Sequence, residues 1–245
     1  MKNLLILGAT SGIARAYINR VADRFEKIVL VARDAGRLEQ LASHVTTISS
    51  ATVSTIESDL SDSSKHKELV AAVINQAGSI DCALISYGQL TDQSRCIEDA
   101  EYAMAQFNLN GTSTISLSLQ IARQMSIQKS GTLAVIGSVA GDRGRRSNYC
   151  YGAAKSAVES FLAGLRSDMQ KHNVHVLTIK PGFVDTPMTS DIKKGALWAS
   201  ADKVAGDIDT AIQKRKNLLY TPWFWRYIML VIKSIPEFIF KKLPL

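Results

Sequence analysis

The stretch that decides the fold reads Leu4-Leu5-Ile6-Leu7-Gly8-Ala9-Thr10-Ser11-Gly12-Ile13-Ala14. Four apolar residues lead into a glycine-rich turn, and a segment with helical periodicity starts at Gly12. Such a turn lets the backbone approach a pyrophosphate, whose charge then lies against the free amides at the helix N-terminus. An ordinary tight turn is the alternative, but the strand before it and the helix after it favour a dinucleotide site. The predicted contacts are Gly8, Thr10, Ser11, Gly12 and Ile13.

Short apolar runs alternate with amphipathic segments along the chain. The predicted strands are Asn3–Leu7, Ile28–Ala32, Val53–Glu57, Cys82–Ser86, Thr132–Ile136, Val174–Ile179 and Leu218–Tyr220. The predicted helices are Gly12–Arg24, Gly36–Ser43, Lys65–Gln76, Ile97–Gln128, Asn148–Lys171 and Ala201–Lys214. Nearly continuous apolar strands indicate burial on both faces, and strict alternation with helices indicates a parallel sheet. We therefore expect an α/β fold, a single doubly wound Rossmann-type domain with a parallel seven-stranded sheet flanked by helices.

The composition changes after Tyr220, where the chain becomes aromatic, aliphatic and basic. We expect a dinucleotide-binding and catalytic domain over residues 1–220 and a C-terminal amphipathic helical appendage over residues 221–245. Thr221-Pro222 is typical of an N-cap followed by the first helical residue. Basic side chains beside Trp, Phe and Leu are typical of a helix that lies in the headgroup layer of a membrane without crossing it. A helix pair buried against the core or a partner subunit is the alternative.

The composition narrows the class of protein. Hydrophobic residues make up 46% of the 245 residues and charged residues 21%, which excludes disordered and disulfide-scaffold classes. The cysteines Cys82, Cys96 and Cys150 are scattered singly, which suits a reducing, cytoplasmic compartment and argues against a metal site. The net charge of +7 favours an anionic partner. We expect no nucleic-acid binding, because no motif or aromatic platform accompanies the charge.

The end of the second predicted strand bears on the choice of cofactor. Arg33 stands where an acidic residue would bind the ribose of NAD, and an arginine there suits a 2′-phosphate. We therefore expect NADP(H) to be preferred over NAD(H), although Asp34 is also placed to reach a ribose. A solvated arginine is the alternative. Asp59 and Leu60, after the third strand, are placed to contact the adenine edge.

Tyr151 and Lys155 lie four residues apart, on one face of a predicted helix. A neighbouring cation lowers the pKa of a phenol, and a shift of two to three units would supply roughly 3–4 kcal/mol toward proton transfer. Ser138 follows a strand, at the carboxyl edge of the sheet where substrates bind. Its hydroxyl is placed to hold a carbonyl oxygen as charge develops on it.

Together these motifs resemble the short-chain dehydrogenase/reductase family, over nearly the whole chain to about Thr186. The resemblance implies a catalytic set of Asn108, Ser138, Tyr151 and Lys155. In this scheme NADPH passes hydride to a carbonyl carbon while Tyr151 protonates the forming alkoxide. Lys155 holds the nicotinamide ribose and lowers the pKa of the tyrosine, and Asn108 anchors a water that reloads the proton. Homo-oligomers are common in the family, and we expect one here.

The resemblance also implies further contacts with the cofactor. Pro181-Gly182-Phe183-Val184-Asp185-Thr186 resembles the nicotinamide-side loop, in which Val184 and Thr186 meet the carboxamide. The family's Asn-Ala-Gly after the fourth strand reads Ser86-Tyr87-Gly88 in this chain. The asparagine that braces the sheet centre is therefore absent, and we expect Tyr87 to pack near the cofactor's ribose instead.

An arginine-rich loop, Asp142–Ser147, lies between the predicted catalytic serine and tyrosine. Its arginines are suited to gripping a substrate phosphate, and a solvated or subunit-interface loop is the alternative. The loop and the tail together resemble one branch of the family, the decaprenylphosphoryl-2-keto-ribose reductases. This branch implies a polyprenyl-phosphate pentose substrate in arabinose-donor synthesis for a cell wall or another glycan. It also implies a flavin oxidase partner and a peripheral position on the inner face of the membrane.

Two other functions stay open at this point. The chain would be a reductase of soluble ketones, aldehydes or acyl substrates if the tail served oligomerisation. It would be a non-catalytic NADP-binding regulator if the catalytic set were unused, although such a regulator has no need of a proton relay.

Overall fold

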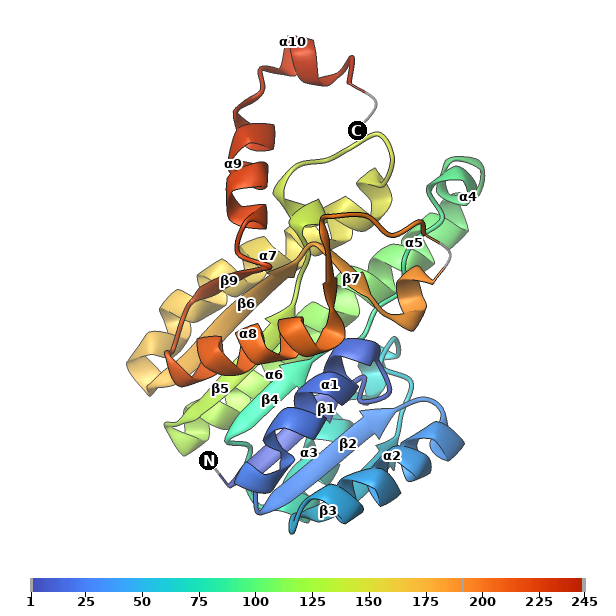
Figure 1. Cartoon of the computed structure of the whole chain (residues 1–245). Coiled ribbons are helices and arrows are strands. Elements are labelled where there is room, and N and C mark those ends of the chain that lie inside the picture. Colours follow the sequence, from blue (N-terminus) through green and yellow to red (C-terminus); the bar gives the residue numbers. More distant parts are fainter. Residues whose placement is uncertain (1, 191, 244–245) are drawn as a thin grey trace.

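The computed structural model describes residues 2–190 and 192–243. Seven parallel strands form one sheet in the order β3-β2-β1-β4-β5-β6-β9 (Figure 1). The strands are β1 (Asn3–Leu7), β2 (Lys27–Ala32), β3 (Thr52–Glu57), β4 (Cys82–Ile85), β5 (Gly131–Ile136), β6 (Val174–Pro181) and β9 (Leu218–Thr221). The prediction of a doubly wound α/β fold with a parallel seven-stranded sheet is therefore confirmed.

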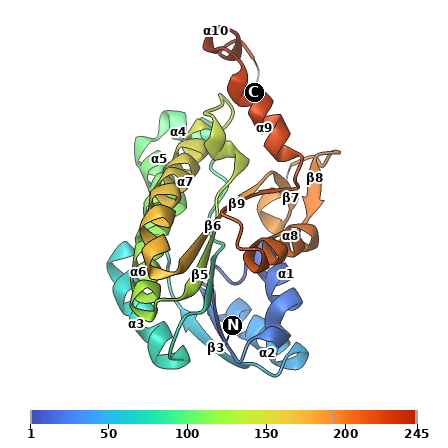
Figure 2. The same cartoon turned by 90° about the vertical axis from the view of Figure 1, so that its left-hand side faces the viewer.

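Helices cover both faces of the sheet (Figure 2). One face carries α1 (Gly12–Val21), α2 (Ala35–Ile48) and α8 (Ala201–Gln213), and the other carries α3 (His66–Ala77), α6 (Ser113–Gln128) and α7 (Tyr149–Met169). Alternate residues of each strand enter opposite halves of the core. Leu4 and Ile6 of β1 pack with the first group of helices, and Leu5 and Leu7 pack with the second. This double burial explains why the strands are apolar at nearly every position.

The long helix predicted over Ile97–Gln128 is divided into four pieces. They are α4 (Gln93–Glu98), α5 (Ala100–Phe107), a π-helical turn (Asn108–Thr112) and α6. Asp99 has extended backbone and caps α5, accepting the N–H of Tyr102 at 2.9 Å. The break therefore follows from a capping aspartate, and the π turn coincides with the asparagine-rich segment.

A second, two-stranded sheet was not predicted. It consists of β7 (Phe183–Asp185) and β8 (Trp198–Ser200), paired in parallel. The rings of Phe183 and Trp198 stack with centroids 5.4 Å apart. Strands of three residues are too short to show a period, so the sequence carries little signal for them.

The tail continues as α9 (Trp225–Ser234) and α10 (Glu237–Phe240), which project beyond the carboxyl ends of the main strands (Figures 1 and 2). The predicted helix start at Thr221-Pro222 is wrong, because Thr221 is the last residue of β9 and its hydroxyl donates to Asp207 at 2.7 Å. Within residues 2–190 and 192–243, no helix is long and apolar enough to cross a bilayer. The last two residues of the predicted appendage, Pro244 and Leu245, lie outside the described residues.

Candidate active site

A cleft of about 830 Å³ opens at the carboxyl ends of the strands. Its walls come from the β1–α1 turn, the ends of β2 to β6, the start of α7 and the root of the tail. Every predicted site residue except Asn108 lines it, namely Gly8, Thr10, Ser11, Gly12, Ile13, Arg33, Asp59, Leu60, Ser86, Tyr87, Gly88, Ser138, Tyr151, Lys155, Pro181, Gly182, Val184 and Thr186. The predicted motifs therefore share one cavity, although they are spread over most of the chain.

Both the backbone conformation and the neighbouring side chains of the glycine-rich turn require a glycine at position 8. Gly8 has φ +79°, and a Cβ there would lie 2.7 Å from the Cβ of Tyr87. Ser11 caps α1 by accepting the N–H of Ala14 at 3.3 Å, and its hydroxyl is 2.9 Å from that of Ser86. The first turn of α1 borders the cleft and contains no acidic residue. This end of the cleft is therefore suited to an anion.

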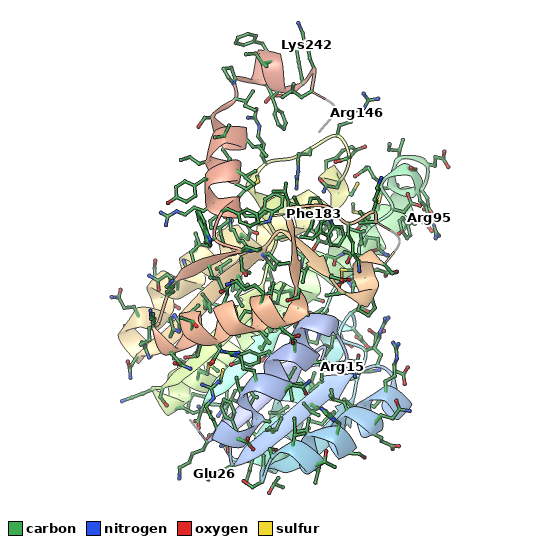
Figure 3. The ribbon with its side chains drawn as sticks, in the orientation of Figure 1. Arg15, Glu26, Arg95, Arg146, Phe183 and Lys242 are labelled. Atoms are coloured by element: carbon green, nitrogen blue, oxygen red, sulfur yellow. The ribbon has the colours of Figure 1, made fainter. Side chains whose placement is uncertain are left out.

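Three guanidinium groups, those of Arg15, Arg33 and Arg37, line the same end of the cleft. Figure 3 shows Arg15 at the N-terminal half of α1. The carboxylate of Asp34 caps α2, because it accepts the N–H of Arg37 at 2.9 Å. Asp59 accepts both the backbone N–H and the hydroxyl of Ser61, and the backbone hydrogen bond is the main cause of its lowered pKa. The surroundings are thus rich in cations, and Asp34 has a local structural role.

Tyr151 and Lys155 lie together on the buried side of α7. The ammonium of Lys155 is 5.7 Å from the centroid of the Tyr151 ring and donates to the carbonyl of Ile136 at 3.2 Å. Burial raises the pKa of Tyr151 to about 12, and a hydrogen bond with Ser138 opposes the rise. Burial lowers the pKa of Lys155 to about 8, against the opposing charge of Glu159.

These directions correct the prediction that Lys155 lowers the pKa of the phenol. Burial dominates at Tyr151, and the negative charge of Glu159 adds to it. The chain's own groups therefore keep the phenol protonated at neutral pH. Tyr151 is suited to donating a proton rather than removing one.

A buried charged triad, Glu159, Lys180 and Asp142, lies behind the predicted catalytic serine. Glu159 accepts the N–H of Ser138 at 3.1 Å and pairs with Lys180 at 2.6 Å. Lys180 also pairs with Asp142 at 2.5 Å, and Asp142 accepts the hydroxyl of Tyr220 at 2.8 Å. The side chains of the triad are only 8%, 10% and 2% exposed, in that order. The triad therefore joins the backbone of Ser138 to the start of the arginine loop.

Sequence reasoning missed this triad. Burial alone would lower the pKa of Lys180, but the charge of Glu159 and the hydrogen bonds with both carboxylates raise it well above its ordinary value. The sequence signal was a lysine in the strand Val174–Pro181, in which the only other polar residues are His175 and Thr178. A buried charge in such a strand calls for a partner, but the partners are distant in sequence.

The structure places Asn108 away from the cleft, contrary to prediction. Its amide donates to the carbonyl of Ser61 at 3.0 Å, and its carbonyl oxygen accepts the hydroxyl of Thr112 at 2.6 Å. Both partners hold it on the outer side of the π turn, where it is half-buried. The expected water contact of Asn108 therefore has no support in this geometry.

Asn110, two residues further on, is the buried asparagine of the π turn. Its Oδ1 accepts the N–H of Gln89 at 2.9 Å, and its amide donates to the carbonyl of the same residue at 3.0 Å. A Cβ at Gly88 would lie 2.7 Å from this Oδ1 and 3.7 Å from the ammonium of Lys155. Asn110 and Lys155 thus border the same glycine. Burial favours Asn110, which was not predicted, over Asn108.

Tyr87 lines the cleft, but its hydroxyl is directed into the protein. It lies 2.7 Å from the hydroxyl of Ser113 in α6, and burial raises its pKa to about 12. Any contact of Tyr87 with a ribose would therefore use the rest of the residue and not the phenolic oxygen.

The arginines of the loop have different surroundings. Arg143 holds the tail, because its guanidinium donates to the carbonyls of Ile232 and Ile235 at 2.7 and 2.6 Å. The same group pairs with Glu237 at 2.8 Å and lies 3.6 Å from the centroid of the Phe240 ring. Arg143 therefore ties the C-terminal end of α9 and all of α10 to the loop.

Arg145 and the root of the tail border the cleft itself. Nε of Arg145 is buried and has no hydrogen-bond partner in the described part of the chain. Trp225 of α9 lies directly over Gly182, where a Cβ would come within 1.8 Å of the indole nitrogen. Its ring meets Phe183 edge-on, with centroids 5.5 Å apart. The tail thus contributes a wall beside the predicted nicotinamide-side loop.

Comparisons with known proteins agree with this geometry. The profile of the family described as short chain dehydrogenase matches residues 2–196. A Mycobacterium tuberculosis protein described as an uncharacterized oxidoreductase is 32% identical over 241 residues, covering 98% of this chain and 96% of that protein. A Streptomyces coelicolor protein, also described as an uncharacterized oxidoreductase, is 29% identical, covering 99% of this chain and 96% of its own.

Solved structures share the fold. A short-chain dehydrogenase from Sphingobium yanoikuyae in complex with NADPH has a TM-score of 0.83 and 23% identity over 97% of each chain. A short chain dehydrogenase/reductase from Burkholderia phymatum in complex with NAD has a TM-score of 0.86 and 21% identity, covering 100% of this chain and 96% of its own. The family profile spans most of the sheet and all of the predicted catalytic and cofactor-binding residues. This chain therefore belongs to the short-chain dehydrogenase family of oxidoreductases.

Proposed function

We propose that this chain is an NADP(H)-dependent reductase that converts the carbonyl of an anionic, lipid-linked keto sugar into an alcohol. The observation that carries the proposal is the convergence of Ser138, Tyr151 and Lys155 on a cleft that also receives the arginine loop and the tail. The protonated phenol favours delivery of a proton, which is the direction of carbonyl reduction.

The residues at the far end of the cleft fit a phosphorylated dinucleotide. The glycine turn and the N-terminus of α1 suit the pyrophosphate, and Arg15, Arg33 and Arg37 suit a 2′-phosphate. Asp34 is engaged as a helix cap, which supports a preference for NADP(H) over NAD(H). The nicotinamide, when bound, supplies the hydride that the chain itself cannot provide.

The chain's own residues then handle the oxygen. Ser138 Oγ accepts the N–H of Ala140 at 3.1 Å and is hydrogen-bonded to the phenol of Tyr151, so the two hydroxyl groups lie together where the carbonyl oxygen of the substrate would bind. As hydride adds to the carbonyl carbon, the C=O π electrons move to oxygen and the proton of the Tyr151 phenol follows. Lys155, held by the carbonyl of Ile136, faces the phenolate left behind. Asn110 and Lys155 both lie close to Gly88, which supports assigning to Asn110 the role that we expected of Asn108.

The proposed substrate is a polyprenyl-phosphate pentose with a 2-keto group, an intermediate of arabinose-donor synthesis. A flavin oxidase partner would form this ketone by oxidising the 2-hydroxyl of the corresponding pentose. Support comes from Arg145 at the cleft and from the exposed apolar side chains of the tail, which are Trp223, Tyr227, Leu230, Val231, Phe238 and Ile239. Exposed Arg226, Lys233, Lys241 and Lys242 stand among them, as an interfacial helix requires. This pattern supports a peripheral position at a membrane surface.

The test is to incubate the protein with a decaprenyl-phosphate 2-keto pentose and NADPH. The reaction is monitored through the loss of NADPH absorbance. We expect turnover by the wild type and a large loss in Tyr151→Phe. Absence of nucleotide oxidation with any polyprenyl-phosphate keto sugar would remove the proposal. If Tyr151→Phe left a cellular role intact, a non-catalytic regulator would be favoured instead.

A second candidate is a reductase of soluble carbonyl compounds whose tail forms a homo-oligomer interface. The exposed apolar face of α9 is compatible with this alternative. Flotation with anionic liposomes separates the two candidates. A tail engaged between subunits leaves the protein in the unbound fraction, whereas the proposed interfacial tail carries it to the top of the gradient.

A further inference from the structure

A second pocket, of about 310 Å³, lies between the arginine loop and α10. It is lined by Gly144, Arg145, Arg146, Tyr149, Glu237, Phe240, Lys241 and Leu243. Arg145 lines both this pocket and the main cleft, so the two spaces adjoin at one guanidinium. Figure 3 labels Arg146 on the loop and Lys242 just after α10, at the same end of the molecule.

Among residues 2–190 and 192–243, the charges around this pocket do not balance. The one carboxylate that these residues place in its lining, that of Glu237, is paired with Arg143 at 2.8 Å. The three cations Arg145, Arg146 and Lys241 form no ion pair with residues 2–190 or 192–243. Nε of Arg145 is buried and lacks an acceptor within the same described ranges. A buried guanidinium nitrogen with an unused donor is unfavourable until an oxyanion supplies the acceptor.

The remaining walls are apolar. Tyr149, Phe240 and Leu243 line the pocket, and the exposed side chains of Phe238 and Ile239 lie on the same short helix as Phe240. A small hydrophilic anion would leave these surfaces in contact with water. A phosphate ester of a long apolar chain would satisfy both the cations and the apolar walls.

We propose that this second pocket binds the phosphate group of an amphiphilic phosphate ester, with Arg145 standing between that phosphate and the carbonyl-reducing cleft. The binding site itself is independent of the reaction. The assignment of its ligand as the substrate rests on the proposed function. Because Arg143 holds α10 against the loop, the pocket exists only while the tail is docked.

The test uses farnesyl phosphate, below its micellar concentration, as the probe in calorimetric titrations of the full chain. Arg146→Gln with Lys241→Gln removes two cations that line this pocket and do not line the cleft. Arg226→Gln with Lys242→Gln is the matched control, since it removes the same charge from exposed positions outside the pocket lining. Circular dichroism melts verify that both variants fold.

We expect the pocket variant to weaken farnesyl phosphate binding at least tenfold, and the control to change it less than threefold. Farnesol, which lacks the phosphate, should bind the wild type at least tenfold more weakly. An equal loss in both variants, or no loss in either, would overturn the proposal. Binding of phosphatidylglycerol vesicles without binding of monomeric farnesyl phosphate would also overturn it, by assigning the cations to a membrane headgroup layer.

The experiments distinguish a failure of the pocket proposal from a failure of the proposed reductase function. If the keto sugar is reduced with an unchanged KM in the pocket variant, the assignment of the substrate as the ligand of this pocket fails and the reductase stands. If farnesyl phosphate binding depends on the pocket but no keto sugar is reduced, the pocket stands and the proposed reaction fails.

Discussion

Replacing Lys180 by methionine tests whether the buried triad behind Ser138 stabilises the fold. Met is unbranched and only one atom shorter than Lys, and it removes the charge. The substitution leaves Glu159 and Asp142 buried without their shared counter-charge. It also leaves the N–H of Ser138 bonded to a carboxylate that has lost its other partner.

The expected cost is large because the groups are buried. Removing one partner of a buried ion pair destabilises a protein by about 3–5 kcal/mol. For a chain of this size each kcal/mol lowers Tm by about 2–4 °C, so the melting temperature should fall by roughly 6–20 °C. Lys194→Met is the matched control, since Lys194 pairs with Asp185 at 2.6 Å but both side chains are about half exposed. That exposed pair should contribute less than about 1 kcal/mol.

The pH dependence gives a second readout. The raised pKa of Lys180 means that its contribution is present at all pH values below its ordinary pKa, about 10.4, and is lost only as the pH rises further. Burial already raises the pKa of Glu159, and loss of Lys180 should raise it more. Protonation of Glu159 then removes an unpaired buried charge from the Lys180→Met variant. The difference in Tm between the variant and the wild type should therefore shrink as the pH falls from 8 to 5. An equal decrease in Tm in Lys180→Met and Lys194→Met would refute this reasoning. So would a decrease in the Tm of Lys180→Met that does not change with pH.

Four further outcomes are expected. Tyr151→Phe should lower kcat by about 10²–10⁴-fold and leave the affinity for NADPH unchanged, as titration of the variant would show. The rate of carbonyl reduction should fall above pH 8, because Lys155, whose pKa burial lowers to about 8, loses its charge while Tyr151 stays protonated; a level rate to pH 10 would contradict this. Arg33→Ala should weaken NADPH binding by roughly 10–100-fold and NADH binding by much less, and equal losses would argue against a 2′-phosphate contact. Arg143→Ala should accelerate amide exchange across α9 and α10, with Arg226→Ala as the unaffected control; unchanged exchange would show that the tail docks without the clamp.

The sheet was predictable because its information is local. Each strand is a short apolar run bounded by turn residues, and β1 was predicted over the same residues that it occupies. The cleft followed from the same signal, since parallel strands bring their carboxyl ends to one edge. Residues as distant in sequence as Gly8 and Thr186 could therefore be assigned to one cavity.

Features that depend on long-range contacts were not predictable. Asp142 and Lys180 are distant in sequence, and nothing local marks them as partners. The choice between Asn108 and Asn110 depends on how the π turn packs, which the helical period does not specify. The pKa of Tyr151 followed burial rather than the charge of Lys155, and burial is a property of the folded protein.

The contact of Trp225 with Gly182 has a consequence for anyone who recombines this chain with its relatives. The indole fills the space that any larger residue at position 182 would need. A chimera that grafts the C-terminal helices onto another scaffold must therefore carry a glycine beneath the tryptophan and, for the far end of the tail, an arginine equivalent to Arg143. The tail is held at two separate points, and both must be transferred with it.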